Sequence, residues 1–344
     1  MSAARPTVVV TGASGVVGRA VVTDLCSDHH VVAMVGSDRT VVADQVLASD
    51  LSEDWMGLTA RTWRELCAQA DAVVHSGALT TWGLAPERYE TVNVAGTRSA
   101  LALAEQARAP LYFVGTCFVH AIERGALELL DVDNVVAPYI ASKLRAEEVL
   151  ASGNAPFSVF RPTNIVGDST TGASSRPQIV QVMSDWICHR RAPFLPAHAG
   201  NRIDVVALDT VAGAVGAAVR RQTTGQLFWL TQGKTAMTPE RSLELLVAHA
   251  ARLGRQLIAP PVADPRGRLP IALSDVAPRS RQFLKVLFDV SEVTHHCGGV
   301  LPDSNDALAS QLDVHQAADE SSFVRSLEYW ARERGQLQLE GAMR

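Results

Sequence analysis

The chain has 344 residues, of which 47% are hydrophobic and 19% charged, and its formal net charge is −5. This length can form one large domain or two modest ones with a full hydrophobic core, and the composition excludes a disordered chain. Acidic and basic residues are mixed along the sequence, without the basic run that is typical of nucleic-acid binding. We therefore expect a globular protein that does not bind nucleic acid.

The cysteines argue against a disulfide framework and against a zinc site. Five of them are scattered along the chain without a C-x-x-C pair, which favours a reducing compartment. The first ten residues, "MSAARPTVVV", lack an apolar run long enough for a signal peptide or a membrane span. We therefore expect a soluble, cytoplasmic protein with no metal and no membrane partner.

The first half of the chain alternates short apolar strands with helices. We expect strands at Val8–Thr11, His30–Val35, Ala70–Ala78 (ending near His75), Pro110–Thr116 and Phe157–Pro162. We expect helices at Gly15–Cys26, Val92–Arg108 and Pro138–Ser152. This alternation predicts an α/β fold, a Rossmann-like doubly wound parallel sheet with a smaller C-terminal substrate-capping domain.

The pattern changes after about residue 166, where "GDSTTGASSRPQ" predicts a loop. The elements expected beyond it are a helix at Gln178–Arg191, a strand at Arg202–Val206, a helix at Asp209–Arg220, a strand at Gly225–Thr231 and a helix that starts at Thr238-Pro239-Glu240. Residues 255–320 hold many prolines and predict a less regular region. We expect a dinucleotide-binding domain of residues 1–165, to which about 207–231 return, and a substrate-binding domain of 166–206 and 232–344.

The stretch "TGASGVVG" places three glycines three residues apart between the first strand and the first helix. Glycines allow backbone N–H groups to approach a pyrophosphate, and the N-terminus of a helix adds a partial positive charge. A turn without a ligand is the simpler interpretation, but the strand before and the helix after favour dinucleotide binding. The predicted cofactor contacts here are Gly12, Ser14, Gly15, Val16, Val17 and Gly18.

The stretch "YIASK" places Tyr139 and Lys143 four residues apart on a predicted helix. This spacing puts both side chains on one face, about 6 Å apart along the axis. A phenol has a pKa of about 10, and a neighbouring ammonium should lower it. The pair could then pass a proton to or from a carbonyl oxygen.

Together these motifs resemble the extended short-chain dehydrogenase/reductase family, whose T-G-x-x-G-x-x-G form stands at residues 11–18. The resemblance covers about residues 7–232 and implies that Thr116 polarises the substrate oxygen beside Tyr139 and Lys143. It also aligns "NVAGT" with a family helix motif, which adds Asn93 to the catalytic set. Further cofactor contacts implied by the resemblance are Asp50, Leu51, Ser76, Gly77, Ala78, Pro162, Thr163, Asn164 and Ile165, together with Tyr139 and Lys143.

The end of the second strand bears on the choice of cofactor. NAD-dependent members carry an acid there for the ribose 2′-hydroxyl, whereas Gly36 occupies that position in this chain. Ser37 and Arg39 follow and could meet a 2′-phosphate, the arginine by charge and bidentate geometry. We expect NADP(H), although Asp38 would restore an acid after a shift of two residues, which leaves NAD(H) open.

The reaction is narrowed by a second resemblance. "RPTNIVGDSTTG" and "HSGALTTW" resemble segments of carrier-linked thioester reductases and fatty acyl reductases, with Thr163 where that branch often has glycine. This implies hydride delivery to an acyl thioester, aldehyde or ketone of a largely nonpolar substrate, delivered on a carrier protein or CoA. The later aromatic and apolar residues Trp186, Phe194, Leu195, Phe283 and Phe288 fit such a substrate, but they fit a hydrophobic core as well.

Two other functions stay open. A nucleotide-sugar epimerase or dehydratase of the same family is one, although Thr116 is followed by Cys117 and Phe118 rather than by the dehydratase Asp-Glu pair. A dinucleotide sensor without activity is the other, although such members usually lose the tyrosine or the lysine. Many extended members pair through the helices near Val92 and Tyr139, so a homodimer is compatible with the sequence.

Overall fold

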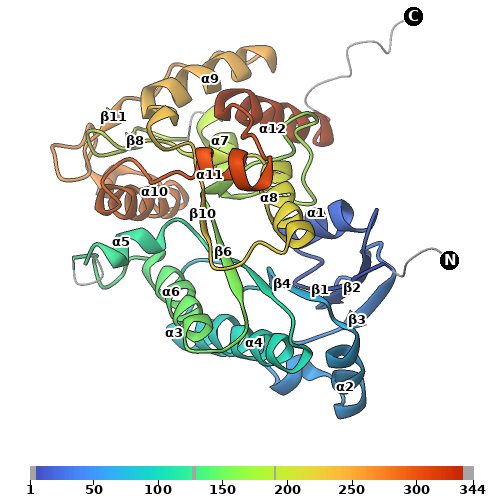
Figure 1. Ribbon diagram of the computed structural model, residues 1–344. Coiled ribbons are helices and arrows are strands. Elements are labelled where there is room, and N and C mark those ends of the chain that lie inside the picture. The colour runs from blue at the N-terminus through green and yellow to red at the C-terminus, as the bar shows by residue number, and fades with distance from the viewer. Residues whose placement is uncertain (1–4, 126–128, 190, 336–344) are drawn as a thin grey trace, which may run out of the picture.

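Seven parallel strands form the central sheet (Figure 1) of this computed structural model, which describes residues 5–125, 129–189 and 191–335. Their order across the sheet is β10-β6-β5-β4-β1-β2-β3, and every neighbouring pair is parallel. The strands are β1 (Thr7–Thr11), β2 (His30–Val35), β3 (Gln45–Ala48), β4 (Ala72–His75), β5 (Leu111–Val114), β6 (Phe157–Pro162) and β10 (Leu227–Leu230). The predicted Rossmann-like fold is therefore confirmed.

The strand sequences are apolar because both faces of the sheet are covered. In β1, Val8 and Val10 belong to one hydrophobic core, while Val9 between them belongs to the core on the opposite face. The helices α1 (Val16–Leu25) and α8 (Leu208–Arg221) pack on the first face, together with the turn η6 (Leu308–Leu312). The helices α2 (Ala60–Gln69), α4 (Ala95–Ala107) and α6 (Ala137–Ala151) pack on the second face.

A third hydrophobic core lies outside the sheet, at the end where α7, α9, α10 and α12 gather (Figure 1). The elements of this region are α7 (Ile179–Cys188), α9 (Pro239–Arg252), α10 (Pro278–His296) and α12 (Asp319–Glu333), with the short strands β7 (Asn164–Ile165), β8 (Leu195–Pro196), β9 (Val205–Val206) and β11 (Val262–Ala263). The remaining short elements are α3 (Pro86–Tyr89), α5 (Val119–Glu123), α11 (Asn305–Ala307) and the turns η1 (Asp54–Gly57), η2 (Glu90–Val94), η4 (Gly233–Thr235) and η5 (Leu273–Asp275).

Most predicted elements agree with the structure to within a few residues, and β2 and β6 match at both ends. Thr238 caps α9 as predicted, because its hydroxyl accepts a hydrogen bond from the N–H of Arg241. Strand β3 was not predicted, since its residues alternate between half-buried and exposed at the sheet edge.

Three expected elements or regions differ from the structure in extent or regularity. The helix expected from Val92 begins at Pro86, because α3 runs through the π-helical turn η2 into α4. The strand expected at Arg202–Val206 shortens to β9, which has two residues. Residues 255–320 contain the 19-residue helix α10, whose buried side chains pack against the third core and so stabilise it despite the nearby prolines.

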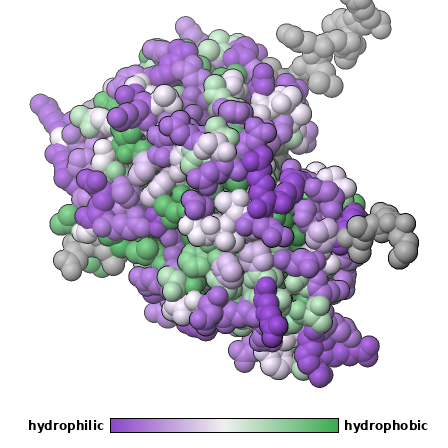
Figure 2. Space-filling view, in the orientation of Figure 1, coloured by the Kyte–Doolittle hydropathy of each residue, from purple (hydrophilic) through white to green (hydrophobic). Residues whose placement is uncertain are grey.

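The surface is mostly polar. Figure 2 shows hydrophilic residues over most of one face, with hydrophobic residues in small separate patches. Within the described part of the chain, no helix combines the length and apolar composition that a membrane crossing requires.

Candidate active site

The glycine loop lies between β1 and α1 and packs against the end of β4. Gly12 has φ +65°, and a Cβ there would stand 2.4 Å from the Cα of Gly77. A Cβ on Gly18 would stand 2.2 Å from the Gly12 carbonyl oxygen, and the Gly15 N–H donates to that same oxygen at 2.8 Å. Only glycines allow this close approach, which is the cradle that a dinucleotide pyrophosphate needs.

Helix α1 begins at Val16 with Gly15 as its N-cap and has no acidic residue in its first turn. Its free N–H groups and partial positive charge can therefore receive an anion. Ser14, Gly15 and Val17 are partly exposed at this end, while Val16 is buried. The loop predicted from sequence thus has the geometry to hold a dinucleotide.

Several of the further cofactor contacts expected from the sequence lie around the end of β4. Ser76 donates to the Thr11 carbonyl at 2.7 Å, and a Cβ on Gly77 would stand 2.6 Å from the Leu51 side chain. The exposed Asp50 carboxylate accepts hydrogen bonds from the hydroxyl and N–H of Ser52, which lower its pKa. Together with the half-buried Ala78, these residues border the glycine loop.

The loop after β2 carries a pair that sequence reasoning missed. Arg19 donates to the Asp38 carboxylate at 2.9 Å and to the Thr40 carbonyl at 3.0 Å. Asp38 is therefore held by a cation and does not stand free. Ser37 and Arg39 are exposed, and among the described residues Arg39 finds no hydrogen-bond or ion-pair partner. The position of Arg19 directly after Gly18 was the available signal.

The structure brings Thr116, Tyr139 and Lys143 together where β5 ends beside α6. The Thr116 hydroxyl lies near enough to the phenol of Tyr139 to act on the pKa of that group. The Lys143 ammonium donates to the Val114 carbonyl at 2.7 Å and lies 4.2 Å from the centre of the Phe113 ring. Both Tyr139 and Lys143 are buried, so their charges are set by the interior of the protein rather than by water.

Burial shifts the two groups in opposite directions. It raises the pKa of the Tyr139 phenol above its usual value, against a lowering by the Thr116 hydroxyl. It lowers the pKa of Lys143 to about 8, while the Glu147 carboxylate acts to raise that pKa. The expectation of a lowered tyrosine pKa was therefore wrong, because desolvation outweighs the other contributions. Near neutral pH the site presents a protonated phenol, which can act as a general acid.

Asn93 connects the loop after β4 to α6. Its amide oxygen accepts from the Leu79 N–H at 2.7 Å, and its NH2 group donates to the Leu79 carbonyl and to the Ser142 hydroxyl. Ser142 in turn donates to the Tyr139 carbonyl at 2.7 Å. Asn93 thus contacts the backbone and a hydroxyl rather than the phenol, so its contacts are those of a positioning residue.

The turn after β6 points its side chains toward residues 204–206. Thr163 and Asn164 donate to the Asp204 carbonyl at 3.0 and 3.1 Å, and Ile165 pairs with Val206. The carbonyl of Pro162 accepts from the Cys117 N–H. Backbone atoms, rather than these two polar side chains, are therefore left to meet a cofactor at this turn.

The following loop, residues 167–172, is fixed by α12. A Cβ on Gly172 would stand 2.1 Å from the Arg325 carbonyl oxygen, and Ser326 accepts from the Gly167 N–H. Within the loop, the Asp168 carboxylate accepts hydrogen bonds from the N–H groups of Thr170 and Thr171 and from the Thr171 hydroxyl. Both ends of the loop therefore contact α12.

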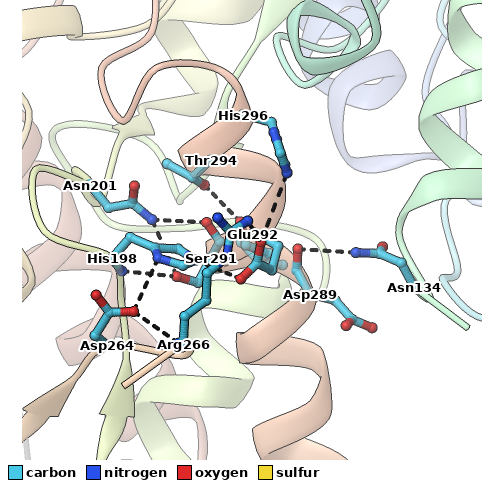
Figure 3. A network of polar contacts seen from close by, with 11 residues as sticks. Asn134, His198, Asn201, Asp264, Arg266, Asp289, Ser291, Glu292, Thr294 and His296 are labelled. Atoms are coloured by element: carbon cyan, nitrogen blue, oxygen red, sulfur yellow. Dashed lines mark hydrogen bonds and ion pairs between the residues drawn. The ribbon is translucent and has the colours of Figure 1, made fainter. Parts of the chain in front are cut away.

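Helix α10 anchors the start of α6, as Figure 3 shows with Asn134 beside Asp289. Asn134 caps α6, since its side-chain oxygen accepts from the N–H groups of Val136 and Ala137. Asp289 accepts from the Val135 N–H at 2.9 Å. The third core thereby holds the helix that carries Tyr139.

Further along α10, Figure 3 shows His198 between two carboxylates. Its ring nitrogens lie 2.6 Å from Glu292 and 3.3 Å from Asp264, and Arg266 donates to Glu292 at 2.8 Å. No group of His, Cys, Asp or Glu side chains within the described residues is arranged to hold a metal ion.

The aromatic residues considered for a substrate pocket lie in the third core. Trp186 stacks on Phe283 with ring centres 5.3 Å apart, and Phe194 contacts Phe288 edge-on. Trp186, Phe194 and Leu195 are buried there, so they stabilise the fold. Cys117 is also buried, which raises the pKa of its thiol well above the usual value and makes a nucleophilic role unfavourable.

A protein-family model and a known protein each match more than half of this chain. The family model described as male sterility protein matches residues 39–215. The polyketide synthase-nonribosomal peptide synthetase ffsA of Aspergillus flavipes is 27% identical over 231 residues, which cover 60% of this chain but 6% of that protein. This chain therefore corresponds to a small part of that relative.

Two solved structures share the fold. The terminal R domain from the myxalamid PKS-NRPS biosynthetic pathway has a TM-score of 0.72 at 22% identity, over 98% of this chain and 93% of that chain. The Bordetella bronchiseptica enzyme WbmH, solved with NAD+, has a TM-score of 0.66 at 17% identity, over 96% of this chain and 99% of that chain. Both likenesses therefore show that this chain shares the fold of those two proteins.

Proposed function

Because the chain belongs to the male sterility protein family, within the NAD(P)-binding extended short-chain dehydrogenases/reductases, we propose that it is an NADPH-dependent carbonyl reductase. The substrate is a largely nonpolar acyl thioester, aldehyde or ketone, delivered on a carrier protein or CoA. The observation that carries this proposal is the buried constellation of Thr116, Tyr139 and Lys143 beside the glycine loop. The name of the relative from Aspergillus flavipes supports a carrier-bound substrate.

The chain's own residues divide the work of proton transfer. The cofactor would supply the hydride, held at its pyrophosphate by the glycine loop and at its nicotinamide ribose by Lys143. The Tyr139 phenol gives its proton to the substrate oxygen, and the Thr116 hydroxyl hydrogen-bonds the same oxygen. A thioester would yield an aldehyde and a free thiol, and a second round would yield an alcohol.

Two arginines support NADPH over NADH. Arg39 is exposed after β2, and Arg19 lies across the same loop, where it neutralises Asp38. A ribose 2′-phosphate would meet positive charge at this end of the site. Residues 166–206 and 232–344 form the substrate side in this proposal, and pairing of two chains through α4 and α6 stays a prediction.

The test follows NADPH oxidation with a medium-chain acyl thioester, its matching aldehyde and an aryl ketone. We expect turnover with the thioester, and the product shows whether two or four electrons are transferred. Tyr139→Phe should lose about 10²–10⁴-fold in rate while it still binds NADPH, because only the transferable proton is removed. Turnover with the aldehyde or ketone alone would make the chain a reductase of free carbonyls.

Two results would contradict the proposal. Full activity of Tyr139→Phe would remove the phenol from the mechanism. No oxidation with any of the three substrates, together with tightly retained NAD+ and conversion of a nucleotide sugar, would make the chain an epimerase or dehydratase instead.

A further inference from the structure

A buried cluster of charges lies behind Lys143 and has no part in the reaction described above. The Arg161 guanidinium bonds the Glu147 carboxylate at 2.5 and 3.2 Å and the Glu123 carboxylate at 2.6 and 3.0 Å. It also lies 4.7 Å from the centre of the Trp229 ring. Arg161 is only 4% exposed and Glu147 is buried as well, whereas Glu123 lies at the exposed edge of the cluster.

The cluster reaches the candidate active site through the end of β5. Glu147 follows Lys143 by four residues on α6, so the two side chains share one face of the helix. The Lys143 ammonium donates to the carbonyl of Val114, and a Cβ on Gly115 would stand 2.8 Å from Oε1 of Glu147. The Lys143 ammonium therefore contacts Val114 and the Glu147 carboxylate lies beside Gly115. These are the two residues directly before Thr116.

Glu147 is the carboxylate whose negative charge raises the pKa of Lys143. From β4, His75 faces the ammonium, but burial lowers the pKa of His75 to about 3, so this imidazole is neutral. From β6, Arg161 is positive, and Glu123 on α5 faces that arginine rather than Lys143. Burial lowers the pKa of Lys143, and Glu147 opposes this shift. Burial also raises the pKa of Glu147, while Arg161 acts to lower it.

We propose that Glu147 is a positioning residue that keeps the Lys143 side chain in its ammonium form and directed at the end of β5, with Arg161 holding the carboxylate ionised. This inference rests on the proposed function only for its consequence in catalysis. Lys143 would be charged at neutral pH because a second, deeper charge pair stands behind it. Sequence reasoning missed Glu147, although its i, i+4 spacing from Lys143 repeats that of Tyr139 and Lys143.

The lysine content of the chain allows a direct test without cofactor or substrate. Lys143, Lys234 and Lys285 are the three lysines of the sequence. Protein labelled with ¹³C at the lysine ε-carbon should therefore give three side-chain NMR signals, assigned with Lys143→Arg. A pH titration of these signals reports each ammonium, and Lys234 serves as the internal reference.

We expect the Lys143 signal to titrate near pH 8 in the wild type. In Glu147→Gln the midpoint should fall by about 1 pH unit or more, because a nearby opposite charge is lost. Glu123→Gln is the matched control, since it removes the other carboxylate on Arg161 but not the one beside Lys143, and its midpoint should stay unchanged. An unshifted Lys143 signal in Glu147→Gln would overturn the inference.

One further variant separates charge from packing. Glu147→Asp keeps the negative charge, so the Lys143 midpoint should return toward the wild-type value. If Glu147→Gln does not fold, the Lys143 midpoint in Glu123→Gln tests the inference. A fall of about 1 pH unit in that variant would show that the whole cluster, and not Glu147, sets the charge of Lys143.

A second readout ties the charge to the proposed function. The alkaline limbs of NADPH binding, followed by fluorescence, and of reductase activity should both move to lower pH in Glu147→Gln. A wild-type protein that is inactive on every substrate would contradict the proposed function. The NMR titration would still test the role of Glu147, because it needs neither cofactor nor substrate. An active wild type whose Glu147→Gln limbs do not move would contradict this inference alone.

Discussion

Residues of the site owe their chemistry to burial and to partners from other elements. Tyr139 keeps its proton and Lys143 has a pKa of about 8 because both lie in the interior. Arg19 and Asp38 show the same principle on the surface, since the arginine neutralises the acid that would otherwise favour NADH. Arg39 is left exposed beside this pair. The proposed preference for NADPH therefore depends on a few side chains.

At this scale we predict that Arg39→Ala raises the Michaelis constant for NADPH about 10-fold or more, with little change for NADH, because a charge-assisted bond to the 2′-phosphate is lost. Steady-state kinetics with both cofactors measures this. Arg279→Ala is the control, since Arg279 is exposed on α10, which does not belong to the sheet or to the glycine loop. Equal changes for the two cofactors would remove Arg39 from the phosphate site.

The glycine loop takes its shape from close backbone contacts among β1, β4 and α1. The loop after β1 reaches the end of β4 so closely that Gly12 and Gly77 leave no room for a side chain. Helix α1 then starts against the same loop, with Gly18 packed on the Gly12 carbonyl. A methyl group on Gly12 or Gly18 must move backbone atoms, which side-chain rotation cannot relieve.

We predict that Gly18→Ala weakens NADPH binding about 10-fold or more and lowers the free energy of unfolding by about 1–3 kcal/mol, because its Cβ would clash with backbone. Isothermal titration calorimetry and urea unfolding measure the two effects. Gly213→Ala in α8 is the matched control, since no atom lies within 4 Å of its Cβ position. That control should be neutral or stabilising, as alanine is the better helix former. Tight NADPH binding by Gly18→Ala would contradict the cradle.

Across the whole molecule, Asp204 joins the sheet to the third core. Its carboxylate accepts from the N–H groups of Gln232 and Gly233, and its carbonyl accepts from Thr163 and Asn164. Burial raises the pKa of Asp204 to about 7 despite the two N–H donors. The junction between the two parts of the chain therefore contains a titratable group.

We predict that Asp204→Asn costs more stability at about pH 5 than at about pH 8, by about 1–3 kcal/mol. The folded chain holds a proton on Asp204 up to about pH 7, whereas the unfolded chain releases it near its ordinary value of 3.8. The wild type therefore loses this contribution as the pH rises from about 4 to about 7, and asparagine does not. Urea unfolding at both pH values measures the difference.

The control for this prediction is Asp313→Asn, whose side chain is 77% exposed. Its effect on the free energy of unfolding should be the same at both pH values. A cost of Asp204→Asn that does not depend on pH would show that Asp204 is ionised throughout.

The parts of the fold that could be predicted are those with a local signal. The apolar runs of β2 and β6 and the capping residues of α9 are contained in a few consecutive residues. Strand β3 has no such signal, because it is short and half-exposed. Helix α10 lies in a region rich in proline, and it is stabilised by packing against residues far away in the sequence.

Local patterns along the chain were enough to predict the alternation of strands and helices, the glycine loop and the i, i+4 spacing of Tyr139 and Lys143, because each depends on neighbouring residues. Contacts between distant segments were needed to see that Arg19 neutralises Asp38 and that Glu147 stands behind Lys143 with Arg161. The tertiary structure also decided the direction of each pKa shift in the site. Desolvation and ion pairing depend on which distant segments meet, and that information is absent from any short stretch of sequence.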